Sequence, residues 1–371
     1  MEPTVASDPM PRGERLATLR ALRRLTQTQL AASLEVSQGF ISQVESGLRP
    51  MPDDLAAAAA HAYGVPLRFF EVRETPAGYP TFRKSSRAGA LAERAIVTAF
   101  DEAARLFREA SQRTGYRAFD VTAAVVEDEE ETAENIRSIL GVDDEAPVQN
   151  TVRALERLGV GVVNALIGDT DEVHHQHTAL SRPAVGNDRP IVATVTSQSG
   201  DRDRLTRMHE LGHLIYDREL SAPIRGTRSS EERRAYRFAG AMLVPASVVR
   251  ARVGESLTLQ GFLPIKADYG VSVAALIVRA RDLHVITEAR ARSLFIQMGT
   301  QGWKVDEPVP VAEEAPLLIT QAVQRSIGTD ARLVADETGV PVDIVARATR
   351  LQAHPKSSGQ IPGNVVRLYP R

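Results

Sequence analysis

The sequence contains no cysteine among its 371 residues. This absence excludes disulfide bonds, iron–sulfur clusters, cysteine nucleophiles and zinc fingers with thiolate ligands. Any metal site in this chain must therefore be built from histidine and carboxylate side chains.

Long hydrophobic segments are also missing. The sequence has no run of about 18 apolar residues, so it offers no single stretch that would cross a membrane. Its first residues, Met1–Thr4, lack the basic and then apolar pattern of a secretory signal. We expect a cytoplasmic protein with no membrane partner.

A large excess of one charge is lacking as well. The chain carries 45 basic and 47 acidic residues, which argues against a general attraction to polyanions. The charge is nevertheless uneven, with 11 basic and 7 acidic residues over 12–87 but 9 acidic residues and 1 basic residue over 127–145. The acidic run is typical of a solvated linker or helix face, and only the N-terminal region favours a nucleic-acid partner.

The length predicts two or three domains. We expect a multidomain chain with an all-α head at 12–75 and a linker and helical segment that includes the acidic stretch at 76–150. An α+β domain at 151–308 and a small helical region at 309–371 should follow. The proline-containing link at 80–84 suggests the first domain boundary, after the head, and Pro308 and Pro310 suggest a second boundary before the helical tail.

The head has the pattern of four short helices. Apolar residues follow helical spacing over 15–34, interrupted by Thr26, which is a good N-cap for a second helix. Ser37 can cap a third helix that Gly47 ends, and the alanine-rich stretch 55–63 forms a fourth.

A helix, a tight turn and a second helix with small polar side chains outside is the geometry that enters the DNA major groove. If Phe40, Ile41 and Val44 point inward, the rest of the third helix is free to meet base edges, and glutamine pairs well with adenine. The candidates for base contact are Gln38, Gly39, Ser42 and Gln43, and those for phosphate contact are Gln27, Arg23, Arg24 and Arg49.

The runs TQxxLA at 26–31 and VSxxxISxxExG at 36–47 resemble those of the XRE (phage repressor-like) helix-turn-helix family over about residues 12–70. The resemblance implies a double-stranded DNA operator as partner and a homodimer, since palindromic operators mirror a two-fold protein. The alternative is a helical bundle that does not read DNA.

The segment His209-Glu210-Leu211-Gly212-His213 is an HExxH motif. Histidines four apart lie on one face of a helix, so both imidazoles can bind one Zn²⁺, and Glu210 can take a proton from the attacking water. Apolar neighbours such as Leu205 and Met208 favour a helix there.

A catalytic zinc site needs a third protein ligand. The metzincin pattern is excluded because Tyr216 and Glu219 stand where it requires glycine and histidine. A carboxylate on the following helix is the gluzincin solution, and Glu232 is our choice, with Glu231 as the rival. Glu232 could instead serve only as part of a capping box with Ser229.

The pattern RxxxxHELGH at 204–213, followed by ExxAxxFAxxxLxP at 232–245, resembles the ImmA/IrrE-type metallopeptidases over about 152–308. The resemblance implies that the α+β domain is a zincin-like metallopeptidase. The precedent in that family is an antirepressor protease, which cuts an XRE-type repressor after a stress signal.

One position departs from that family pattern. Family members usually carry Asn or Asp, a group expected to orient a ligand histidine, where this chain has Tyr236. The Tyr236 hydroxyl could orient a ligand or donate to an oxyanion, or the ring could simply pack. Tyr236 is therefore a catalytic candidate beside Glu210.

Other features in the second half have less specific interpretations. His174, His175 and His177 could form a second metal cluster, but a solvated loop is favoured. The stretch 179–195 can form a hairpin with its turn at Gly186-Asn187-Asp188, and an exposed edge of that hairpin could hold a substrate peptide. Trp303 is expected in the core, and the weak helix-turn-helix pattern at 333–341 is expected to be plain helical packing.

These patterns predict a transcriptional regulator with a zinc peptidase domain that cleaves a repressor-type partner or its own linker at 71–90. The alternative is a non-catalytic repressor, or the antitoxin of a toxin partner, in which zinc is structural or the domain senses a ligand. A digestive peptidase is disfavoured because it would not need a DNA reader.

Overall fold

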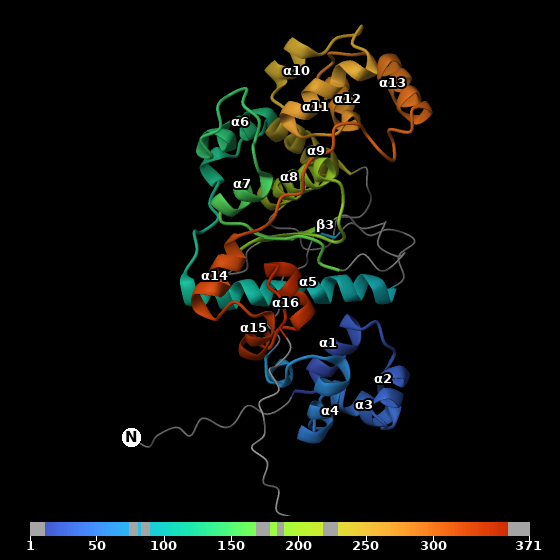
Figure 1. Ribbon diagram of the computed structural model, residues 1–371, viewed down its shortest axis with the longest axis vertical. Helices are drawn as coiled ribbons and strands as arrows, with labels where there is room; N and C mark the ends of the chain where they lie inside the picture. The colour runs from blue at the N-terminus through green and yellow to red at the C-terminus, as the bar shows by residue number, and fades with distance from the viewer. Residues whose placement is uncertain are drawn as a thin grey trace, which may run out of the picture.

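The computed structural model describes residues 12–73, 81–82, 90–167, 179–183, 189–217 and 229–354. Within these ranges the chain forms a helical head at one end, a mixed body with a small sheet in its middle, and C-terminal helices packed against the other side of that sheet (Figure 1). The architecture is multidomain, as predicted.

The head consists of four α-helices and a short 3₁₀ helix: α1 (Glu14–Leu22), α2 (Gln27–Ser33), α3 (Gln38–Glu45), α4 (Asp53–Tyr63) and η1 (Leu67–Phe70). Thr26 begins α2 with a full capping box to Gln29, and the Ser37 hydroxyl accepts from the Phe40 amide at the start of α3. These caps satisfy amides that would otherwise lack partners, which fixes the turn between the two helices.

The body sheet has four strands in the order β1-β3-β4-β2: β1 (Thr81–Phe82), β2 (Gly161–Val163), β3 (Ala179–Arg182) and β4 (Ile191–Thr194). Strands β2 and β4 are parallel, whereas β3 runs antiparallel to both β4 and β1. The predicted pairing of the two halves of 179–195 is present. Its expected turn at 186–188 lies outside the described residues, as do His174, His175 and His177.

Side chains alternate between the two faces of this sheet, so the sheet separates two cores. Val162 and Val192 pack into the core on the α8 side, while Leu180 and Ala193 pack on the opposite side. The first core contains α6 (Glu129–Ile139), α7 (Thr151–Arg157), α8 (Gly200–Tyr216), α9 (Ser230–Leu243), α10 (Ala246–Arg252), η4 (Leu259–Phe262), α11 (Leu263–Tyr269), α12 (Val273–Asp282) and α13 (Glu288–Thr300). Trp303 belongs to this core, as expected.

The second core joins segments that lie far apart in the sequence. The long helix α5 (Ala90–Thr114) lies under the sheet, next to α14 (Leu318–Ser326), α15 (Ala331–Thr338) and α16 (Val342–Thr349) (Figure 1). The weak pattern at 333–341 therefore corresponds to packed helix.

Several contacts cross the predicted boundaries at 150 and 308. Helix α5 shares the second core with the C-terminal helices, and α6 packs on α9. Glu314 lies beyond the second boundary but accepts from the amides of Thr151 and Val152 at the start of α7. Residues on the two sides of each position are therefore in contact, and the domain boundaries stay a prediction.

A buried ionic cluster joins the head to the body. Arg15 of α1 donates to Glu102 of α5 at 2.7 Å, and Arg105 donates to the same carboxylate at 2.6 Å. Arg105 also donates to the backbone oxygens of Thr338 and Gly339. The Arg15–Glu102 pair thus holds the head on α5, and η1 of the head contacts α15, both separately from the covalent link.

None of the described helices is by itself long and apolar enough to cross a membrane; one bent pair, Leu259–Tyr269 with Val273–Asp282, passes on length and composition alone.

Candidate metal centre

Two helices supply the residues of the candidate site. Helix α8 carries the HExxH motif, and α9 begins at the Ser229 N-cap, whose hydroxyl accepts from the Glu232 amide. The capping contact thus uses the backbone amide of Glu232, while its carboxylate turns toward the histidines of α8. The helices come close because Gly212 faces Ala235, where an added Cβ would lie 3.0 Å from the Ala235 Cα.

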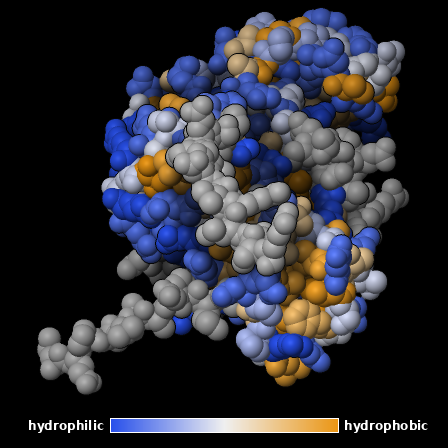
Figure 2. Space-filling model, turned by 60° about the horizontal axis from the view of Figure 1, so that its bottom comes forward, coloured by the Kyte–Doolittle hydropathy of each residue, from blue (hydrophilic) through white to orange (hydrophobic). Residues whose placement is uncertain are grey.

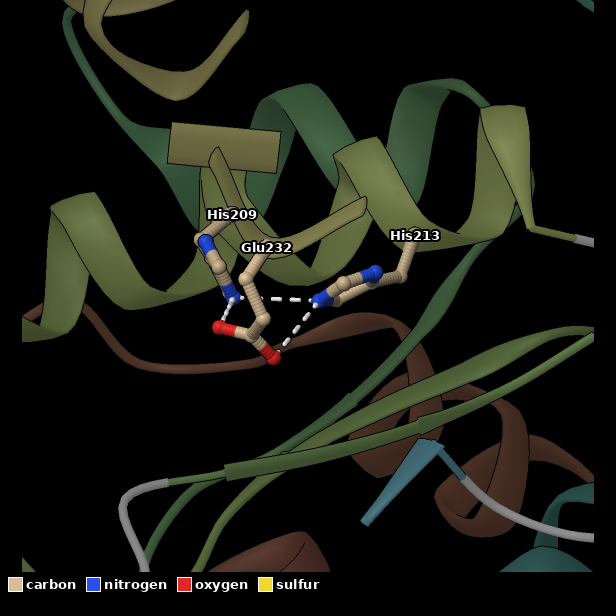
Figure 3. A group of neighbouring side chains, drawn as sticks. All are labelled: His209, His213 and Glu232. Carbon is tan, nitrogen blue, oxygen red and sulfur yellow. Dashed lines mark hydrogen bonds and ion pairs between the residues drawn. The ribbon is translucent and has the colours of Figure 1, made fainter. Parts of the chain in front are cut away.

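The side chains of His209, His213 and Glu232 converge on one point, in the space between the helices and the sheet (Figure 3). The two Nε2 atoms are 3.1 Å apart, and each lies 3.6 Å from an oxygen of Glu232. All three side chains are buried. Among the described residues this is the one group of three such side chains that could hold a metal ion.

These distances fit a tetrahedral ion. With bonds of about 2.0 to 2.1 Å, tetrahedral ligand atoms lie about 3.3 Å from one another. Two imidazole nitrogens and a carboxylate form the donor set of an open zinc site, in which the fourth position is left for water or substrate. The residues present therefore fit a bound metal ion. Glu231, the rival ligand, is not part of the group.

Asp217 orients one of the two histidines. Its carboxylate lies 2.7 Å from His213 Nδ1 and also accepts from Arg234 at 2.6 Å. A proton on Nδ1 leaves the lone pair on Nε2, which is the atom that faces Glu232. Nothing in the sequence patterns above singles out Asp217, although a carboxylate four residues after a helical histidine is a usable signal.

The carboxylates around the histidines make this a site that attracts cations. Burial disfavours a charged imidazole, but hydrogen bonds to Asp217 and Glu232 and the charge of Glu210 outweigh it and raise the pKa of His213 to about 10. The same negative surroundings would stabilise a divalent ion in place of the proton.

Glu210 does not join the three convergent side chains. It is buried beside them on α8, and its carboxylate accepts from the Ser181 hydroxyl of β3 at 2.6 Å. Ser181, which the sequence patterns do not indicate, faces α8 because it alternates with Leu180 on the strand.

Tyr236 lies one helical turn beyond Glu232. Its ring centroid is 4.1 Å from that of His209, and its side chain remains 42% exposed. The ring therefore packs on His209 while one side faces solvent.

Arginines on the far side of α8 fix the helix in place. Arg204 and Arg207 both pair with Glu314, and Arg207 also pairs with Asp203 at 3.0 Å. Arg204, which belongs to the family pattern, thus acts as a structural anchor.

In the head, most predicted DNA contacts lie on α3 and its neighbouring turns. Gln38, Gly39 and Gln43 are exposed and Ser42 is half-buried, on a helix that points away from the body (Figure 1). Gln38 donates to Gln27 at 2.7 Å, and Gln27 in turn donates to Glu45 at 2.8 Å.

The three predicted phosphate-contacting arginines differ in their surroundings. Arg49 is exposed and lies over the Phe40 ring, and Arg24 is half-buried with a positive φ of 54°. Arg23 instead pairs with Asp343 of α16 at 3.2 Å and donates to the backbone oxygen of Tyr63. Arg23 therefore points to the C-terminal helices, which the head sequence alone could not reveal.

Two known families match this chain. Residues 13–68 match the helix-turn-helix domain family, and residues 155–281 match the family described as IrrE N-terminal-like domain. No curated protein matches the chain significantly. The chain therefore joins an N-terminal helix-turn-helix DNA-binding domain to an ImmA/IrrE-type peptidase domain.

Proposed function

We propose that this protein is a DNA-binding transcriptional regulator whose IrrE-like domain is a zinc-dependent endopeptidase. The observation that carries this proposal is the convergence of His209, His213 and Glu232 beside the buried carboxylate of Glu210. The head would bind an operator, and the body would make one regulated cut in a repressor-type partner or in this chain.

In this proposal each residue of the site has a distinct role. His209, His213 and Glu232 hold the ion, which when bound polarises a carbonyl and lowers the pKa of water. Glu210 takes the proton of the attacking water and passes it to the leaving amine. Ser181 fixes the Glu210 carboxylate by its hydrogen bond, and Asp217 keeps the His213 lone pair on Nε2.

Tyr236 has a second catalytic role in this proposal. The proposal is supported by the packing of its ring on His209 and by its partly exposed side chain. We assign to it the donation of a hydrogen bond to the oxyanion that forms when water attacks.

The proposal for the head is a homodimer that reads DNA with α3. Gln38 is oriented by Gln27, which leaves one amide hydrogen and the carbonyl oxygen of Gln38 to pair with adenine. Hydrophobic residues gather on the face of the head in Figure 2, and Leu48 and Leu67 of the head are 82% and 50% exposed. These side chains are candidates for the dimer contact.

The function is tested by comparing the wild-type chain with Glu210→Gln. Both metal-loaded proteins are incubated with an extract of the source cells, and new protein N-termini are identified by mass spectrometry. Cuts made by the wild type and absent with Glu210→Gln, at equal zinc content, are the expected result. If the wild type and Glu210→Gln produced the same cuts, the peptidase assignment would be wrong.

A second function is favoured by one observation. An apolar cavity of about 430 Å³ lies between α9, α12 and α13, and Leu205, Tyr236 and Phe295 are among its lining residues. A cavity of this size suits a small ligand. The domain could thus be a ligand sensor in a repressor or antitoxin, with zinc as a structural ion. Reporter induction that survives Glu210→Gln unchanged would support this function over proteolysis.

A further inference from the structure

The inference concerns the edge of strand β3. This strand runs antiparallel to β4 on one side, and its inner face contacts α8 through the hydrogen bond from Ser181 to Glu210. Adjacent strands lie about 4.8 Å apart, so an extended peptide added to the other side of β3 passes beside the Glu210 carboxylate. Extended peptides commonly bind proteins by adding to such an edge.

That edge of β3 is already occupied by this chain. Thr81 pairs with Ser181 and Phe82 pairs with Leu180, in the antiparallel direction. The two residues form β1 and come from the segment that joins the head to α5. Thr81 of β1 thus lies directly opposite Ser181, whose hydroxyl donates to the Glu210 carboxylate.

We propose that β1 is an internal competitor that closes the peptide-binding edge of the candidate peptidase site. Backbone groups along one edge of a strand pair with one neighbour at a time, so β1 and an incoming polypeptide exclude each other. Strand β1 therefore keeps the site shut until it leaves β3. The inference rests on the proposed function, since it assigns the regulation of that site.

The strength of this block follows from the tether. A two-residue strand pairs weakly by itself. The covalent link supplies an effective concentration of about 1 mM, so if the tethered strand has an intrinsic Kd near 0.1 mM for this edge, an incoming peptide binds about tenfold more weakly to the closed chain. Such a block stops chance substrates but yields to a partner that binds more tightly.

The test measures peptide binding in full-length chains that all carry Glu210→Gln, which prevents hydrolysis. The probe is a fluorescent peptide of residues 77–87 of this chain. Thr81→Pro with Phe82→Pro removes the amides that β1 can donate to β3. The matched control is Ser86→Pro, which adds a proline to the same interdomain segment but leaves the paired residues unchanged.

The double-proline chain is expected to bind the probe about tenfold more tightly than the unchanged chain. The Ser86→Pro chain should bind like the unchanged one. Equal affinity for all three chains, or no binding to any of them, would overturn the proposal.

Hydrogen exchange on the same proteins provides a second readout. The amides of β3 should exchange faster in the double-proline chain and in a Thr81→Gly, Phe82→Gly chain, which avoids the rigidity of proline. Unchanged exchange at β3 in both variants would show that β1 does not cover this edge.

The outcome can be separated from that of the proposed function. One outcome is that the chains bind no zinc and cleave no peptide, while the double-proline chain still binds the probe more tightly. The peptidase proposal then fails and the inference stands. If chains with Glu210 intact hydrolyse the probe at the same rate with and without the prolines, the inference fails and the peptidase proposal stands.

Discussion

At the scale of single residues, the candidate site depends on side chains beyond the three convergent ones. An imidazole can carry its proton on either nitrogen, and only the form protonated on Nδ1 presents its Nε2 lone pair to a metal. Asp217 selects that form of His213, and Arg234 holds Asp217. Sequence spacing identifies HExxH but not the group that selects the tautomer.

We expect Asp217→Ala to weaken zinc binding by about 10- to 100-fold, because the orientation of His213 is lost. The measurement is a competition titration with a chelator of known affinity. Asp268→Ala, which removes an exposed partner of Arg252, is the matched control and should change nothing. An unaltered zinc affinity in Asp217→Ala would contradict the role of Asp217.

Replacing Tyr236 separates a chemical role from a packing role. Tyr236→Phe keeps the ring on His209 but removes the hydroxyl, so kcat for a cleaved peptide should fall by about 10²- to 10³-fold with the zinc content unchanged. Steady-state kinetics would detect the change. A normal kcat in Tyr236→Phe would leave packing on His209 as the role of this residue.

In the head, Gln38→Ala should relax specificity at one adenine of the operator by about 1 to 3 kcal/mol. Arg49→Ala should instead weaken binding to all sequences alike and reduce its salt dependence, because it removes a phosphate contact. Binding titrations on an operator selected from random DNA would compare the two variants. If Gln38→Ala instead lost affinity equally for all DNA sequences, Gln38 would contact the DNA backbone and not a base.

At the scale of elements, the distance between α8 and α9 sets the geometry of the site. Gly212→Val would place side-chain atoms against Ala235 and Phe238, so α9 must move and carry Glu232 away from the histidines. Gly254→Ala is the control, since its Cβ would meet nothing within 4 Å.

Gly212→Val is expected to lose most of its zinc while Gly254→Ala keeps it. Elemental mass spectrometry on the purified chains measures this directly. Full zinc content in Gly212→Val, with native circular dichroism, would show that the close approach of the helices is not required.

The helices with strong local signals could be predicted from the sequence. N-caps such as Thr26 and Ser37 mark where helices begin. The spacing of HExxH predicts which side chains share a face of α8. Glu232 could be chosen because it lies on the helix that follows HExxH, where the gluzincin arrangement places a carboxylate ligand. These features depend on contacts within a few residues.

Features that depend on contacts between distant segments could not be predicted. Strand β1 has two residues and exists only because β3 offers an edge. Arg23 has the sequence of a phosphate-binding residue, yet it pairs with Asp343, 320 positions away. Ser181 gains its role from the face of β3 that meets α8.

At the scale of the whole molecule, the head and the body are joined by the chain, by the buried cluster of Arg15, Glu102 and Arg105, and by the pair of Arg23 with Asp343. Cutting the interdomain segment alone should therefore leave the head bound. Burial by itself would raise the pKa of Glu102, but Arg105 and Arg15 outweigh it, so the pKa lies below its ordinary value of 4.5.

The sign of the pH effect on this interface follows from that shift. A lowered carboxyl pKa contributes stability that is present above pH 4.5 and is lost as the pH falls through the folded value. A chain cut at a protease site introduced within 74–80 should keep its head in gel filtration at pH 7. It should release the head in acid or with Glu102→Ala, since removing one partner of a buried pair costs about 3 to 5 kcal/mol. Release of the head at pH 7 without any substitution would contradict this.

The central claim is that His209, His213 and Glu232 form a zinc site, and its most direct test is the metal content of the purified chain by elemental mass spectrometry. Glu232→Ala is measured beside the wild type, with Glu231→Ala as the control on the neighbouring carboxylate. The structure predicts one zinc per chain in the wild type and in Glu231→Ala, and little in Glu232→Ala. No zinc in the supplemented wild type, or equal zinc in Glu232→Ala, would contradict the account.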